Sequence, residues 1–162
     1  PLAYRYFCMT ALYRRPLNFT WEALKGAENT LDRLREHVLS LKTDTVELTG
    51  KSVQYHEKYE EALINDLNMP QALAVLWEVV RDGTLEAAQK YSLIIHFDKI
   101  LGLRLDTLQE VVVPPDIQEL LEKREVARAS KDWAASDTLR DEIVAKGYII
   151  MDSADGQRVK KT

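Results

Sequence analysis

Apolar residues recur with a helical period through most of the chain. The clearest stripe uses alternating steps of three and four residues: Leu24, Ala27, Leu31, Leu34, Val38 and Leu41. Such a stripe is typical of the buried seam of an amphipathic helix. Thr20 precedes it and is a good N-cap, because its hydroxyl can accept a backbone N–H of the first turn. The pattern therefore predicts a long helix that begins after Thr20.

Further helices are predicted on both sides of this seam. Residues 2–14 form an apolar run that Pro16 ends, because the residue before a proline avoids the α region. A loop with Gly50 follows the long helix. A third helix is then expected over 53–67, with Leu67 on its inner face.

Two more helices complete this first part of the chain. Pro70 suits the first turn of a fourth helix, whose core face would be Leu73, Leu76 and Val80. We expect Thr84 to cap a fifth helix that ends at Gly102, since glycine readily takes the left-handed conformation found there. Residues 19–104 are therefore predicted to form an antiparallel helical bundle.

The composition changes at LDTLQEVVVPPD, where paired prolines indicate a stiff linker over 105–115. The remainder, 116–162, is expected to form a small α/β unit. Its elements would be a helix over 116–130, a helix over 133–146 and a short β-hairpin that starts with the β-branched stretch 148–152. The fold class is thus mainly α, with two helices and a hairpin at the end.

Composition and charge narrow the class of protein. The 162 residues carry a net charge of −4, which argues against general nucleic-acid coating but allows a local basic site. Residues 1–116 hold 17 acids and 13 bases, whereas 117–162 hold nine of each. The single cysteine, Cys8, lies in an apolar run, and we expect it to be a buried thiol in a reducing, cytoplasmic compartment. Because the sequence begins PLAYRYF without Met, we expect a piece of a longer protein.

One side of the helix predicted over 133–146 carries unusual chemistry. Trp133, Asp137 and Arg140 recur at i, i+4 and i+7, and therefore share a face. Trp133 could pack over the joint between the two last helices, or its ring could stack on an unstacked base. Asp137 and Asp152 could accept hydrogen bonds from the amino groups of bases, or could be an ordinary surface residue and a turn residue.

Basic residues offer a second set of candidates. Arg124, Arg128 and Lys131 follow one another along the helix over 116–130, where they could grip phosphate or form ion pairs with the next helix. Arg14 lies among tyrosines near the start of the chain, a pattern compatible with RNA backbone binding or with the rim of an amphipathic helix. All of these assignments stay open on spacing alone.

Signs of catalysis are missing from the sequence. His37, His56 and His96 fall on three different predicted helices without zinc-ligand spacing, and we interpret them as surface or boundary residues. There is no glycine-rich phosphate loop, nucleophile elbow or Cys/His cluster. We expect neither a catalytic residue nor a metal site or cofactor in this chain.

Four segments together resemble one family. They are YRRPLNFTWEAL (13–24), ALINDLNMPQALAVL (62–76), KILGLRL (99–105) and REVARASKDWAASDTLRDEIVAKGYIIMDSADG (124–156). In this order they are similar to the C-terminal part of cysteinyl-tRNA synthetases. The last segment is the most specific, because it combines R-x-x-x-R-x-x-K-D-W-x-x-x-D-x-x-R-D with G-x-x-I-x-D.

The resemblance implies a fold and a function. The bundle would be the anticodon-binding type of class I synthetases, residues 1–18 would join it to a catalytic domain, and 116–162 would recognise the anticodon. The implied partners are a cysteine tRNA and the upstream catalytic domain of the same enzyme, with no DNA, no membrane and a monomeric state. ATP and zinc would belong to that upstream domain, so the intact ligase would be the enzyme and this chain alone non-catalytic.

The resemblance also implies site residues. Arg128, Trp133, Asp137 and Asp152 match anticodon contacts, while Arg124, Lys131, Arg140 and Arg14 are candidates for the RNA backbone. The expected anticodon, GCA, shows an amino group on every base, for which carboxylates are suitable acceptors. Where the family usually has Gly-Thr-x-Trp, this chain has Gly156-Gln157-Arg158-Val159. Two alternatives therefore remain: a helical protein-interaction module of the same fold, and the C-terminal part of a related ATP-dependent cysteine ligase.

Overall fold

The chain folds into two compact units, 1–109 and 110–162. The computed structural model describes residues 1–109, 113–153 and 156–161, and within the hairpin it describes the side chains of 148–150, 157 and 159. Each unit has its own hydrophobic core. Among the described residues, no helix is both long and apolar enough to span a bilayer.

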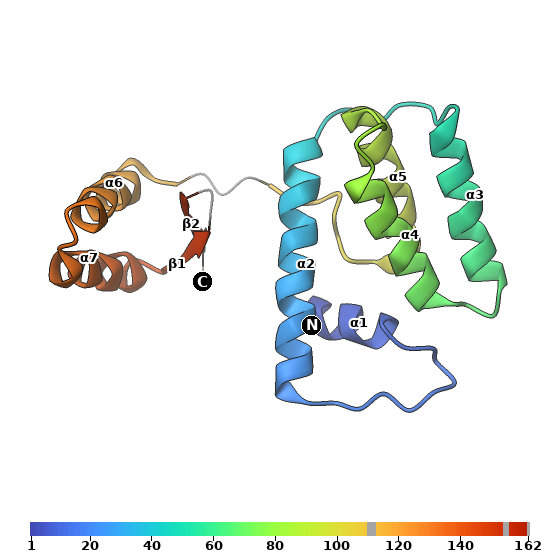
Figure 1. Cartoon of the computed structure of the whole chain (residues 1–162), viewed down its shortest axis with the longest axis horizontal. Helices are drawn as coiled ribbons and strands as arrows, with labels where there is room; N and C mark the ends of the chain where they lie inside the picture. Colours follow the sequence, from blue (N-terminus) through green and yellow to red (C-terminus); the bar gives the residue numbers. More distant parts are fainter. Residues whose placement is uncertain (110–112, 154–155, 162) are drawn as a thin grey trace. The chain divides into compact units, whose positions relative to one another are not determined.

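The first unit is a bundle of five helices (Figure 1). They are α1 (Leu2–Met9), α2 (Trp21–Leu41), α3 (Lys51–Ile64), α4 (Met69–Arg81) and α5 (Ala87–Leu101). In Figure 1 the short α1 runs across the direction of α2, and it packs on both α2 and α4. The mainly helical fold predicted from periodicity is confirmed.

Helix α2 forms as its sequence dictates. The Thr20 hydroxyl accepts from the Ala23 N–H at 3.0 Å, which satisfies one of the free donors of the first turn. The middle of the predicted seam is buried, and its end residues Leu24 and Leu41 pack against the same core partly exposed. The inward placement of Leu67 is wrong, because α3 ends at Ile64 and Leu67 lies exposed in the following turn with a positive φ.

Two predictions about the start of the chain are corrected. The first helix ends at Met9, five residues before the predicted end, where the Thr10 hydroxyl and N–H both bond the Phe7 carbonyl. Cys8 is exposed, because α1 buries its other side through Tyr6 and Phe7. Since both residues belong to the core of the bundle, α1 is an integral part of the first unit.

The end of α5 is fixed by a buried carboxylate. Asp98 accepts the N–H groups of Leu103 and Leu105, each at 2.7 Å, one on each oxygen. Immediately before these two residues the chain turns at Gly102, which has a φ of +62°. Arg5 donates to the Gly102 carbonyl at 3.0 Å, and a Cβ on Gly102 would meet only the flexible end of the Arg5 side chain. Glycine is therefore favoured here for its left-handed backbone conformation.

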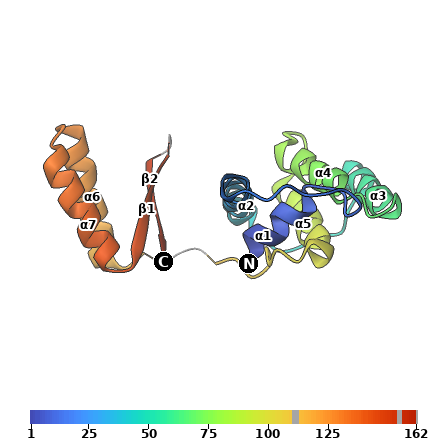
Figure 2. The ribbon, with the colours of Figure 1, turned by 90° about the horizontal axis from the view of Figure 1, so that it is seen from below.

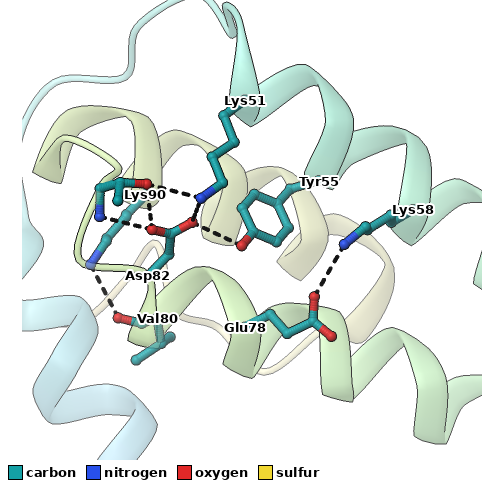
Figure 3. A network of polar contacts seen from close by, with 8 residues as sticks. Lys51, Tyr55, Lys58, Glu78, Val80, Asp82 and Lys90 are labelled. Carbon is teal, nitrogen blue, oxygen red and sulfur yellow. Dashed lines mark hydrogen bonds and ion pairs between the residues drawn. The ribbon is translucent and has the colours of Figure 1, made fainter.

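A second polar cluster joins α3 to the end of α4 (Figure 3). Asp82 accepts from the Tyr55 hydroxyl at 2.8 Å, from Lys51 at 2.7 Å, and from both the N–H and the hydroxyl of Thr84. Hydrogen bonds from Lys51 and Thr84 hold the pKa of Asp82 well below its usual range. Burial, followed by the bond to Asp82, raises the pKa of Tyr55 to about 12. Because Thr84 bonds Asp82, it does not cap α5, which starts only at Ala87.

The second unit contains α6 (Pro115–Ala129), α7 (Trp133–Ala145) and the antiparallel strands β1 (Tyr148–Ser153) and β2 (Gly156–Lys161). The two helices lie side by side, and α7 continues directly into the hairpin (Figure 2). The core is small: Ile117, Ile143, Tyr148 and Ile150 are buried, with Leu121 and Val159 among the residues packed against them. The predicted pair of helices followed by a hairpin is confirmed.

Candidate nucleic-acid interface

A tight turn between α6 and α7 positions the candidate tryptophan. The Asp132 N–H bonds the Ala127 carbonyl at 2.8 Å and the Lys131 N–H bonds the Arg128 carbonyl at 3.0 Å, the pattern of a Schellman C-cap. Lys131 has a φ of +61° at the position where glycine is usual. Asp132 then caps α7 by accepting from the Ala135 N–H, as predicted. Trp133 is consequently held at the first position of a well-capped helix.

The predicted face of α7 is open. Trp133 is 60% exposed, and Asp137 and Arg140 are exposed along the same side of the helix. Ser136 and Ile143 are buried on a different side and anchor α7 to the core. The ring, the carboxylate and the guanidinium are thus presented together to the outside. Their contact with RNA stays a prediction.

Arg124 requires a correction. Its side chain is only 4% exposed, and its Nη1 donates to Gln157 Oε1 at 2.8 Å. The Gln157 amide donates in turn to the Leu121 carbonyl. Arg124 therefore continues the buried stripe of α6 begun by Ile117, and fastens β2 to that helix. A guanidinium placed in this way does not fit the predicted role at the RNA backbone.

The other candidates have varied positions. Arg128, in the last turn of α6, and Lys131, in the turn, are exposed and precede Trp133. The backbone of Asp152 pairs with that of Gln157 in the hairpin, but its side chain lies outside the described residues. Arg14 belongs to the first unit and forms an exposed ion pair with Asp66 at 2.7 Å. The second unit accordingly provides the main candidate surface.

One polar pair was missed by reading the sequence. His56 on α3 and His96 on α5 are hydrogen-bonded through their Nε2 atoms at 2.9 Å, although 40 residues separate them. Burial and the neighbouring His56 lower the pKa of His96, which favours the neutral form of the His96 ring. His37 is exposed, as expected of a surface residue. Within the described residues, no group of three or more His, Cys, Asp or Glu side chains is arranged to hold a metal ion.

Two protein-family models match separate parts of the chain. Residues 58–106 match the DALR domain, and residues 111–159 match the cysteinyl-tRNA ligase anticodon binding domain. The second match contains α6, α7 and most of the hairpin, and therefore the whole Trp133 face.

Individual relatives agree with these matches. The chain is 40% identical to cysteine–tRNA ligase 1 of Burkholderia lata, over 98% of the chain and 33% of that protein. It is 33% identical to cysteine–tRNA ligase of Borrelia hermsii, over 99% of the chain and 38% of that protein. The enzyme of Chlamydia pneumoniae is 37% identical over 96% of the chain and 36% of its own length. The chain belongs to the cysteinyl-tRNA synthetase family. It corresponds to the anticodon-binding C-terminal region and spans about a third of the length of these relatives.

The structure accounts for the unusual end of this family member. Where the resemblance led us to expect Thr and Trp, the chain has Gln157 and Val159. Val159 packs against the small core, and Gln157 joins Arg124 to the Leu121 carbonyl. The hairpin therefore forms and is fastened to α6 with this altered sequence.

Proposed function

We propose that this chain binds a cysteine tRNA and reads its anticodon with the exposed face of α7. The observation that carries the proposal is the shared exposure of Trp133, Asp137 and Arg140 within the region matched by the anticodon binding domain. Anticodon bases are single-stranded, so they can be splayed out and read by stacking and by hydrogen bonds to their edges. The arrangement supplies a stacking ring, an acceptor and a cation within about two turns of one helix.

Each side chain has a distinct role in this proposal. The Trp133 ring stacks on one base, a contact worth about 1–3 kcal/mol. Asp137 accepts from an exocyclic amino group, as a carboxylate does from cytosine. Arg128 and Arg140 hold a base edge or a phosphate, with Lys131 and Arg14 as further cations and Asp152 as a second acceptor. Arg124 has a structural role instead, because it fastens β2 to α6.

Fluorescence anisotropy with a cysteine tRNA and an anticodon-substituted copy tests the proposal. We expect Trp133→Ala to weaken binding of the cognate tRNA by about 5- to 150-fold, which corresponds to the loss of one stacked base. Binding of the substituted copy should change less. Equal affinity of the unaltered chain for both RNAs at physiological salt would refute anticodon reading.

A matched carboxylate pair sharpens this experiment. Asp137→Asn should reduce discrimination between the two RNAs. Glu142→Gln removes the same charge from the same helix, about 140° around its axis from Asp137, and both carboxylates are exposed. It should leave discrimination unchanged. Equal effects of the two substitutions would show that only overall charge matters.

The wider proposal concerns the complete ligase. Its catalytic part, with bound ATP and zinc, would attach cysteine to the tRNA that this region holds, in the cytoplasm and as a monomer without affinity for DNA. Absence of tRNA binding by a correctly folded chain, together with capture of a defined protein partner, would favour the interaction module instead.

A further inference from the structure

Two partly buried histidines of the first unit direct their Nε2 atoms at each other. His56 lies on α3 and His96 on α5, and their Nε2 atoms are 2.9 Å apart. The ring centroids are 4.6 Å apart and the ring planes are inclined by 57°. We call His56 and His96 the histidine pair. Its geometry fits a hydrogen bond, and it equally fits two ligands that share one metal ion.

The separation of the two nitrogens selects a coordination geometry. An imidazole nitrogen lies about 2.0–2.1 Å from a bound divalent transition-metal ion, so two of them are about 2.9 Å apart at a right angle and about 3.4 Å apart at the tetrahedral angle. The observed 2.9 Å matches the right angle. Square-planar and tetragonal ions such as Ni²⁺ and Cu²⁺ have this angle, whereas tetrahedral Zn²⁺ would require the two rings to move apart.

A rigid contact between the two helices fixes this separation. Tyr59 follows His56 by one turn of α3, and Phe97 follows His96 directly on α5. Both are almost completely buried, and their rings stack with centroids 3.9 Å apart and planes inclined by only 9°. The Tyr59 hydroxyl also donates to the Phe97 carbonyl at 3.1 Å. The framework is therefore in place before any ion binds, which is a requirement for a precise site.

Glu60 orients one ring of the histidine pair. Its Oε2 lies 3.6 Å from His56 Nδ1, which favours a proton on Nδ1 and leaves the lone pair of His56 Nε2 free. A carboxylate beside the outer nitrogen is a recurrent partner of metal-bound histidine. Without an ion, His96 then donates through its Nε2–H. When an ion takes the place of this proton, the proton moves to His96 Nδ1, so both rings stay neutral.

We propose that the histidine pair binds a divalent transition-metal ion of the Ni²⁺ or Cu²⁺ type, which clamps α3 to α5. Water completes the coordination, because no group of three or more His, Cys, Asp or Glu side chains in the described part of the chain could hold a metal ion, and the His56 side chain is 22% exposed. Glu60 and Lys99 shift the pKa of His96 in opposite directions, so their charges oppose one another at the pair. The site is independent of the proposed anticodon reading.

Calorimetric titration of the 162-residue chain with Ni²⁺ tests the site. The protein carries no affinity tag, and Cys8→Ser is the background, because the exposed thiol of Cys8 would itself bind metal. We expect one Ni²⁺ per chain. His56→Gln and His96→Gln should each weaken binding by at least about tenfold, since even the loss of an outer partner costs that much. The matched control is His37→Gln, which removes the third histidine, exposed on α2, and should leave binding unchanged.

Hydrogen exchange tests the clamp without any histidine substitution. Saturating Ni²⁺ should slow the exchange of amides in α3 and α5, because the ion joins these two helices. Amides of α7, in the second unit, should exchange at an unchanged rate. This measurement decides the matter should either histidine variant fail to fold.

Four results would overturn the proposal. The first is the absence of Ni²⁺ binding, and the second is tighter binding of Zn²⁺ than of Ni²⁺, which would contradict the right-angle geometry. The third is undiminished binding after the loss of either histidine of the pair, which would show an adventitious surface site. The fourth is exchange that slows as much in α7 as in α3 and α5. Because these measurements contain no RNA, their failure leaves anticodon reading untouched.

Discussion

Lys131 adopts a backbone conformation that a residue with a Cβ disfavours. Its φ of +61° lies at the C′ position of the turn that connects α6 to α7. The left-handed region costs about 1 kcal/mol for such a residue, whereas glycine enters it freely. We therefore expect Lys131→Gly to stabilise the second unit by about 1 kcal/mol. Hydrogen exchange of the amides in α7 measures this gain in stability for the second unit alone.

The control for this prediction is Lys131→Ala, which removes the charge and keeps the Cβ. It should give no gain in protection. Both substitutions should weaken tRNA binding equally if the lysine ammonium contacts phosphate. A loss of protection in the glycine variant would show that the lysine stabilises the turn by another contact.

Individual residues were predictable where their role depends on neighbours in sequence. The sequence left the exposure of the Trp133 face open, whereas the shared face of Trp133 and Asp137 follows from helical spacing and the local cap at Asp132. The burial of Arg124 does not, because its acceptor on Gln157 lies 33 residues away. Cys8 was misplaced for a related reason: an apolar run shows that a helix is buried but not which side of a short helix faces the core.

At the scale of elements, the junction of α3 and α4 should respond to acid. The folded-state pKa of Asp82 is depressed, mainly by hydrogen bonds from Lys51 and Thr84 (Figure 3). A carboxylate whose pKa is depressed in the folded state stabilises the fold fully above its unfolded-state pKa of about 4. This stabilisation is lost as the pH falls through the folded-state pKa. Asp82→Asn should therefore be less stable than the unaltered chain at pH 7, and the difference should shrink below about pH 4. Urea unfolding at several pH values measures it.

Asp106→Asn is a suitable comparison, since Asp106 is an exposed aspartate in the same unit. Its free energy of unfolding should follow that of the unaltered chain at all pH values. If both variants showed the same pH dependence, the cluster around Asp82 would not be the cause of the acid sensitivity.

Element boundaries were predictable where a local cap decides them. Thr20 and Asp132 start α2 and α7 as expected, because each satisfies an N–H within its own first turn. Thr84 has the same chemistry, yet its hydroxyl bonds Asp82 and α5 begins later. The end of α1 at Met9 was missed as well, because Pro16 shows only where a helix must already have stopped.

At the scale of the whole molecule, helical periodicity predicted the mainly α class, and the prolines near 115 marked the change of composition close to the division between the two units. The contacts between elements could not be predicted in this way. The His56–His96 pair and the approach of Arg5 to Gly102 both depend on helices distant in sequence. The contacts of Phe19 with Tyr4 and Trp21 were missed for the same reason, since Tyr4 and Trp21 belong to different helices.

The distribution of charge over the molecule leads to a final prediction about salt. With Arg124 buried, the candidate cations are Arg128, Lys131 and Arg140 in the second unit and Arg14 in the first. Each phosphate contact on single-stranded RNA contributes about −0.7 to the slope of log affinity against log salt. Four contacts therefore set a limit of about −3, and the net charge of −4 adds no general attraction. Anisotropy titrations of this chain with cysteine tRNA between about 50 and 200 mM salt should give a slope no steeper than this. Arg140→Gln should make the slope shallower by about 0.7, whereas a steeper slope in the unaltered chain would require a phosphate-binding surface beyond these four residues.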